Sequence, residues 1–211
     1  MIDTPGKLLD AAEKLFATQG FGAVSLRQII AEADVNVAAV HYHFGSKQEL
    51  LDQVVMRKAG PVNRERLELL DRVETEANGS PEVEAILGAF MLPMAQTATE
   101  HPQFPKLMGR MQSEGILSEV VTRNFQPVIA RFLAALRKSV PHVPDNEFRW
   151  RIHFMQGAIA AAMSSEPQAV SNPIDDGGFR KRIERLIVFL GAGLRAPAAA
   201  EKPAKPSGKN K

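Results

Sequence analysis

Apolar residues recur every three or four positions along most of this chain, the spacing that places them on one face of a helix. In the first such segment, Leu8, Leu9, Ala12, Leu15 and Phe16 share a face. The same pattern predicts helices over residues 6–18, 26–33, 37–44, 47–59, 63–77, 81–99, 104–111, 117–139, 146–165 and 179–194. No alternating pattern predicts a pair of strands, so we expect an all-α protein.

Residues that favour helix ends separate these segments. Ser25 and Ser46 are followed three positions later by Gln28 and Glu49, the pattern of a capping box at the start of a helix. Gly60-Pro61 lies within an otherwise helical pattern, and we expect it to break or kink the helix that begins after Ser46.

The stretch from residue 25 to residue 47, SLRQIIAEADVNVAAVHYHFGSK, contains two short helices joined by a tight turn at Asp34-Val35. This arrangement is typical of a helix-turn-helix whose second helix reads DNA in the major groove. Small side chains such as Val37 and Ala39 let that helix approach base edges, and the following His and Tyr side chains can reach bases or phosphates. The predicted DNA interface consists of Ser25, Arg27, Asn36, Val37, Ala39, His41, Tyr42, His43 and Lys47.

The aromatic end of this second helix has an alternative interpretation. His41, Tyr42, His43 and Phe44 can instead pack the interior of a small domain, because aromatic residues at helical spacing often belong to a core. For Phe44 we favour packing, and for Tyr42 both interpretations stay open.

The positive charge of the chain is concentrated at its C-terminus. Residues 1–60 contain six Lys and Arg against seven Asp and Glu, a net charge of −1. Residues 201–211 contain four lysines against one glutamate, a net charge of +3. DNA affinity must therefore come from a few locally placed cations, since phosphate contacts dominate it. The Pro-, Ala- and Lys-rich segment 196–211 is predicted to be disordered.

Composition excludes several other classes of protein. A chain of 211 residues without cysteine has neither a disulfide framework nor a thiolate metal site, which fits a cytoplasmic location. It begins without a signal-peptide pattern and contains no apolar run of about 18 residues, so we expect no membrane span. No metal-binding, phosphate-binding or catalytic motif is present, so we expect no metal, no cofactor and no enzymatic activity. A helical dimer that binds a ligand but not DNA is a third class, and the intact run 36–47 argues against it.

Residues 8–55 resemble the DNA-binding domain of the TetR family of bacterial regulators. The resemblance is carried by LLDAAEKLFATQGF, SLRQIIAEADV and NVAAVHYHFGSKQELL. His41 stands where tyrosine is most common in the family, and Asp34 and Ala38 stand where glycine is common.

This resemblance implies an all-α homodimer. Each subunit would have an N-terminal three-helix helix-turn-helix domain (1–50), a larger C-terminal helical domain for ligand binding and dimerisation (51–195) and the disordered tail (196–211). The expected partners are a double-stranded DNA operator, a small apolar effector and a second copy of the chain. The expected function is that of a ligand-responsive repressor that binds a palindromic operator, with half-sites about 34–36 Å apart.

The segment FRWRIHFMQGA, residues 148–158, resembles the corresponding helix of fatty-acid-responsive repressors in this family. It implies an effector such as a fatty acid or acyl-CoA, and a regulator of drug efflux or other catabolic genes with a non-acyl ligand is the alternative. Methionines suit adaptable apolar cavities, and arginines can bind acidic head groups, although ordinary core and surface roles remain alternatives for each. The candidate ligand residues are Phe90, Met94, Met108, Met111, Arg149 and His153.

The predicted helices over residues 146–165 and 179–194 are candidates for the dimer interface. Two such helices from each subunit would form a four-helix interface. His153 lies on the same broad face, where a hydrogen-bonded interface or core role competes with a role in the pocket. The candidate interface residues are Trp150, Phe154, Gly157, Ala161, Ile183, Ile187 and Leu190.

Overall fold

The computed structural model describes residues 3–36, 44–78, 81–101, 103–163 and 178–198. These residues form helices and connecting turns without a strand, which confirms the predicted all-α class. The helices are α1 (Thr4–Gln19), α2 (Leu26–Ala33), α4 (Lys47–Glu76), α5 (Val83–Glu100), α6 (Gln103–Ser113), α7 (Leu117–Ser139), α8 (Asp145–Met163) and α9 (Phe179–Arg195). The helix predicted over 37–44 falls on residues 37–43, which lie outside the described part.

Local capping fixes the helix ends around the predicted DNA interface. The Ser25 side chain accepts a hydrogen bond from the Gln28 amide, and the Gln28 side chain accepts one from the Ser25 amide, so the capping box is confirmed. Asp34 ends α2 in the left-handed conformation, with φ of 51°. Ser46 caps α4 by accepting from the Glu49 amide at 3.1 Å.

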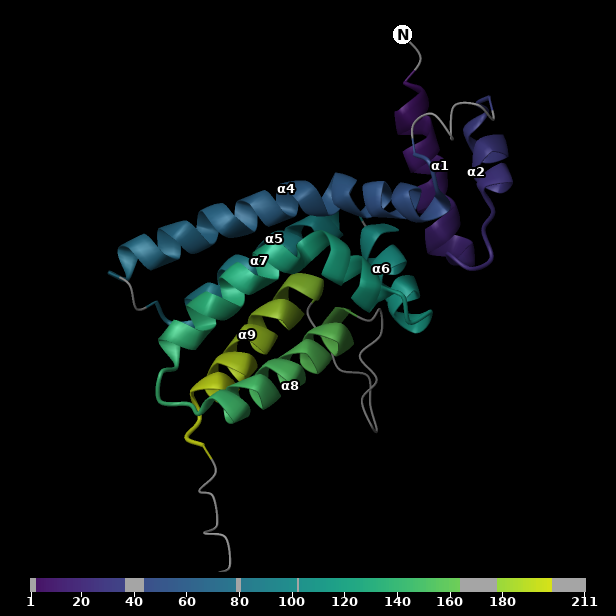
Figure 1. The fold of residues 1–211 in the computed structure, drawn as a ribbon. Helices are drawn as coiled ribbons and strands as arrows, with labels where there is room; N and C mark the ends of the chain where they lie inside the picture. The colour runs from purple at the N-terminus through teal and green to yellow at the C-terminus, as the bar shows by residue number, and fades with distance from the viewer. Residues whose placement is uncertain (1–2, 37–43, 79–80, 102, 164–177, 199–211) are drawn as a thin grey trace, which may run out of the picture.

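Helix α4 is the longest described element and continues through Pro61 for 30 residues, so of the predicted break or kink at this position the break is wrong. Pro61 lies on the exposed side of the helix, whereas Ala59, Val62 and Asn63 beside it are buried. Packing on the buried side therefore carries the helix past the one amide that proline cannot donate. Figure 1 shows α1 and α2 at one end of α4 and the α5, α7, α8 and α9 layers beneath the other.

Two apolar cores share α4. The N-terminal core joins α1, α2 and the part of α4 that ends at Val62 to residues of the following helices, and it includes Phe44, as favoured from the sequence. The C-terminal core begins at Leu70 of α4 and extends over α5, α7, α8 and α9. The later helices contribute Met94, Phe104, Leu107, Met111, Val120 and Phe125 to the N-terminal core. The core of the first helices thus extends onto α6.

Polar contacts reinforce the packing of α6 on α1. The carboxylate of Glu114 accepts a hydrogen bond from the Phe21 amide at 3.0 Å. Arg110 donates to the Gln19 carbonyl at 3.0 Å and to Glu114 at 3.1 Å. Between these contacts Gly20 adopts a φ of 91°, and a Cβ atom there would clash with the Glu114 carboxylate. The turn after α1 is therefore shaped to fit the end of α6.

We expect Gly20→Ala to lower the free energy of unfolding by ~1–3 kcal/mol, because it combines an unfavourable left-handed conformation with the clash against Glu114. Urea denaturation followed by circular dichroism measures this change. Gly22→Ala is the matched control, because a Cβ atom at Gly22 meets nothing within 4 Å, and its effect should stay below about 0.5 kcal/mol. Equal effects of the two substitutions would contradict the proposed fit between this turn and α6.

Candidate functional site

The start of α2 presents two of the predicted DNA-contacting residues. Arg27 is exposed, and its guanidinium makes no hydrogen bond or ion pair with the described residues. The Ser25 hydroxyl is also exposed, but it donates to the Gln28 side chain at 2.7 Å as part of the capping box. Arg27 is thus free to contact a phosphate near a helix start, where backbone amides and the helix dipole also favour an anion.

Lys47 has a structural function that the sequence did not indicate. Its ammonium group donates to the carbonyls of Phe21 and Val24 at 2.7 Å each and lies 4.3 Å from the centre of the Phe21 ring. The first residue of α4 therefore holds the loop between α1 and α2. The phosphate contact predicted for Lys47 stays a prediction, and it must share the ammonium with these two carbonyls.

Five of the predicted DNA contacts lie outside the described residues, and their base contacts stay predictions. Asn36, which precedes them, is exposed. The five are Val37, Ala39, His41, Tyr42 and His43.

Acidic partners neutralise other cations near this surface. Arg57 forms ion pairs with Asp10 at 2.7 Å and Glu13 at 2.6 Å, which joins α4 to α1. Lys14 pairs with Glu32 at 2.6 Å and so joins α1 to α2. These pairs also neutralise the carboxylates of Asp10, Glu13 and Glu32, which would otherwise repel phosphate, whereas Arg27 has no acidic partner among the described residues.

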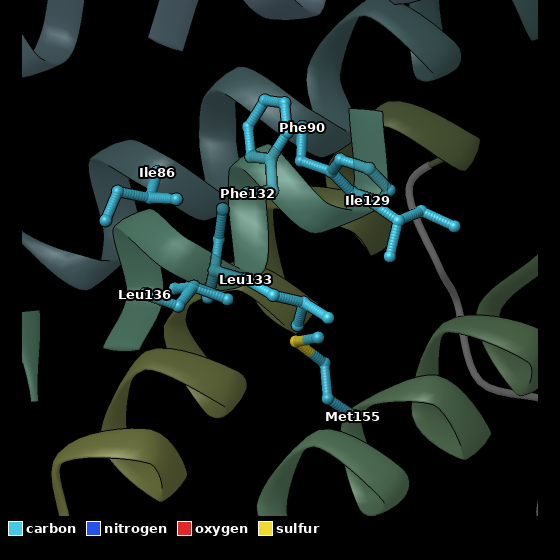
Figure 2. A pocket seen from close by; sticks show the side chains of 8 residues that line it. Ile86, Phe90, Ile129, Phe132, Leu133, Leu136 and Met155 are labelled. Carbon is cyan, nitrogen blue, oxygen red and sulfur yellow. The ribbon is translucent and has the colours of Figure 1, made fainter. Parts of the chain in front are cut away.

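An apolar cavity of about 40 Å³ lies among α5, α7 and α8. Figure 2 shows Phe90 at one side and Met155 of α8 directed toward Leu133 of α7. The lining residues are Ile86, Leu87, Phe90, Ile129, Phe132, Leu133, Leu136 and Met155. The side chains around the cavity are all apolar, so they suit a hydrocarbon group.

Phe90 is the one candidate ligand residue that lines this cavity. The structure places Met94 and Met111 in the N-terminal core, with Met108 packed against that core. Met94 follows Phe90 by one helical turn on α5, but its side chain packs in the N-terminal core, as does Met111 on the buried face of α6.

Arg149 and His153 were also candidates for ligand binding, but both are exposed on α8. The cavity side of that helix carries Met155 instead. His153 forms an edge-on ring contact with Trp150, at 5.9 Å between the ring centres, so it belongs to the outer face of α8.

Large apolar side chains are exposed on α8 and α9 among polar ones. Trp150 is 52% exposed and Phe154 65% exposed, and their rings stack with centres 5.7 Å apart. Gly157 and Ala161 on the same helix are exposed as well. These residues are therefore accessible, and the interface predicted on α8 stays a prediction.

The predicted interface on α9 requires a correction, because Ile183, Ile187 and Leu190 are buried in the C-terminal core of their own subunit. Their regular spacing marks the inward face of an amphipathic helix. The outward face carries Val188 and Phe189, which are 66% and 70% exposed. In the sequence, the outward face could have been recognised from these two apolar residues, because they fall outside the regular spacing of Ile183, Ile187 and Leu190.

Two further features bear on function. The described residues contain no group of His, Asp and Glu side chains arranged to hold a metal ion. Within the same residues, no helix combines the length and the apolar character needed to cross a membrane.

We expect Lys47→Ala to lower the free energy of unfolding by ~1–3 kcal/mol, because two carbonyls lose a charged donor. Chemical denaturation measures the effect, and Lys7→Ala, an exposed change on α1, should have little effect. If Lys47 also contacts phosphate, the salt dependence of DNA affinity becomes shallower by about one unit. An unchanged unfolding free energy would rule out the structural function of Lys47.

Comparison with known proteins gives matches to both parts of the chain. The model of "Bacterial regulatory proteins, tetR family" matches residues 8–54, and the model of "Tetracyclin repressor-like, C-terminal domain" matches residues 84–193. The chain is 36% identical over 97 residues to the HTH-type transcriptional regulator BetI of Rhizobium meliloti, covering 39% of this chain and 48% of that protein. It is 27% identical over 124 residues to the HTH-type transcriptional repressor KstR2 of Mycobacterium tuberculosis, covering 57% and 59%. The chain thus spans about half the length of these curated relatives.

Solved structures show the same fold. The fatty acid degradation regulator FadR from Bacillus halodurans matches with a TM-score of 0.61 at 14% identity, covering 90% of this chain and 99% of that one. A tetR family transcription regulator from Shewanella sp. PV-4 matches with a TM-score of 0.57 at 18% identity, covering 77% and 84%.

The relatives of this chain are transcriptional regulators and not enzymes. The family models account for the helix-turn-helix segment and for most of the helices that follow it. The chain therefore belongs to the TetR family of bacterial regulatory proteins.

Proposed function

We propose that the protein is a ligand-responsive, homodimeric repressor that binds a palindromic operator and is released from it by a small apolar molecule such as a fatty acid or acyl-CoA. The observation that supports a dimer is the exposure of large apolar side chains on α8 and α9, namely Trp150, Phe154, Val188 and Phe189. Large apolar side chains gathered on one surface indicate an interaction site.

A second copy of the chain is the occupant we propose for this surface. A two-fold axis beside α8 and α9 would bring the same residues of both copies into contact, as a self-complementary interface requires. Burial of one such aromatic or aliphatic side chain contributes ~1.5–3 kcal/mol, so a few from each subunit are enough to hold two copies together. The α1 and α2 end of each subunit lies away from this interface and remains available to DNA (Figure 1).

The symmetry of such a dimer sets the form of the operator. Two identical helix-turn-helix domains related by a two-fold axis bind an inverted repeat, with half-site centres about 34–36 Å apart. If the ligand changes the distance between the two helix-turn-helix domains, the affinity of the dimer for that repeat falls, although neither domain changes its own structure.

The apolar cavity among α5, α7 and α8 supports an apolar effector. Its volume of about 40 Å³ is far below the roughly 300–1,000 Å³ of ordinary ligand sites, so the helices must separate to admit a ligand. Helix α5 packs against α4, and α4 carries part of the N-terminal core. Separation of α5 from α7 is therefore mechanically linked to the position of the DNA-binding helices.

We expect the double substitution Phe154→Glu with Phe189→Glu to convert the dimer into a monomer, because it places charges within the proposed interface. Sedimentation equilibrium gives the mass directly. Gln156→Glu, which adds a charge at an exposed position elsewhere on α8, should leave the dimer intact. A wild-type protein that sediments as a monomer, or a double variant that stays dimeric, would contradict the proposed interface.

Selection from a random DNA library with the full chain should recover an inverted repeat, and Tyr42→Ala should remove its specific recognition while the variant stays folded. Fatty acids, acyl-CoAs and unrelated apolar compounds are then added to the protein–operator complex in a gel-shift titration. Release by an acyl compound supports the proposed effector class, and release by non-acyl compounds alone favours the alternative. Selection of unrelated sequences without symmetry would contradict the dimeric operator.

A further inference from the structure

One buried cation close to the apolar cavity has no counter-ion among the described residues. Arg66 of α4 is 5% exposed. Its Nε atom donates to the Phe90 carbonyl at 2.6 Å, and Nη1 donates to the Asn63 side-chain oxygen at 2.9 Å. Both partners are neutral.

Other buried charges in the described part of the chain are compensated. Glu13 is paired with Arg57, and Arg151 is paired with Glu147 at 2.9 Å. Burial lowers the pKa of Arg66 to about 10, with no nearby carboxylate to oppose the shift, and the group still carries its charge at neutral pH. An uncompensated charge in such a position is costly, so its presence calls for an anion.

The position of Arg66 connects this charge to the cavity. Its guanidinium carbon lies 4.1 Å from the centre of the Phe90 ring. Phe90 itself lines the apolar cavity and is only half-buried, and its ring meets Phe132 edge-on at 5.0 Å. One aromatic side chain thus separates the buried cation from the cavity, and a rotation of Phe90 would join the two.

We propose that Arg66 binds the carboxylate of an amphipathic ligand whose hydrocarbon chain occupies the apolar cavity. This inference rests on the proposed ligand-responsive function and narrows its effector to a free carboxylic acid. Nη2 has no partner among the described residues and can donate to the carboxylate together with Nη1. A coenzyme A thioester presents a neutral carbonyl at the corresponding position and leaves the charge of Arg66 uncompensated.

Calorimetric titration of the full chain with dodecanoate, methyl dodecanoate and dodecanoyl-coenzyme A tests the proposal. The wild-type protein should bind dodecanoate about tenfold or more tightly than the ester. Arg66→Met should remove this preference, Arg66→Lys should keep part of it, and Arg64→Met, an exposed change two residues away, should keep all of it.

Thermal unfolding separates ligand binding from a structural role. Without ligand, Arg66→Met removes an uncompensated buried charge but also takes a donor from the Phe90 carbonyl and the Asn63 side chain, so these opposed effects should leave its unfolding temperature close to that of the wild type. It should also lose the stabilisation that dodecanoate gives to the wild-type protein. A less stable variant that still binds dodecanoate with wild-type affinity would show that Arg66 is structural and overturn the proposal.

Three other results would overturn it: no binding of dodecanoate, equal binding of acid and ester, or tighter binding of the thioester. The acid–ester comparison needs no variant, so it decides the question even if Arg66→Met fails to fold. Operator release is measured separately. Binding through Arg66 without release contradicts the proposed effector but not this inference, and release that persists in Arg66→Met contradicts this inference but not the proposed function.

Discussion

The packing of α1 against α6 is the contact on which the placement of the helix-turn-helix against the C-terminal helices depends. Phe16 of α1 and Phe104 of α6 are fully buried in one apolar core, and Met111 lies in the same core. Close-packed interiors transmit displacement because they have little free volume to absorb it. Under the proposed function, movement of α6 would therefore displace α1, which packs against α2 of the helix-turn-helix.

Helix α4 provides a second connection between the two ends of the molecule. Near its start, Arg57 pairs with Asp10 and Glu13 of α1. Further along, α4 packs on α5, whose Phe90 lines the cavity. Because α4 continues through Pro61 without a break, one helix links α1 to α5, which lines the cavity. Under the proposed function, a displacement at the cavity would reach α1 through α4.

Short-range signals were the part of the fold that could be predicted from the sequence. The Ser25 capping box and the Ser46 cap are confirmed because both ends of each hydrogen bond lie within a few residues. Spacing also identified buried helix faces, but it could not tell which surface each face meets. For this reason Met111 was expected in the ligand site but lies in the N-terminal core, and Ile187 was expected in the dimer interface but lies in the interior of its own subunit. Arg66 lies in a charged run, where the sequence gives no sign of its burial.

The hydrogen bond from the Phe21 amide to Glu114 joins residues 93 positions apart in the chain. Its donor is a backbone group in the turn after α1, and its acceptor is a side chain just beyond α6. Exchange of this amide proton with solvent deuterium requires that bond to open. The native chain thus carries its own reporter of the α1–α6 contact, readable in solution without a label or a substitution.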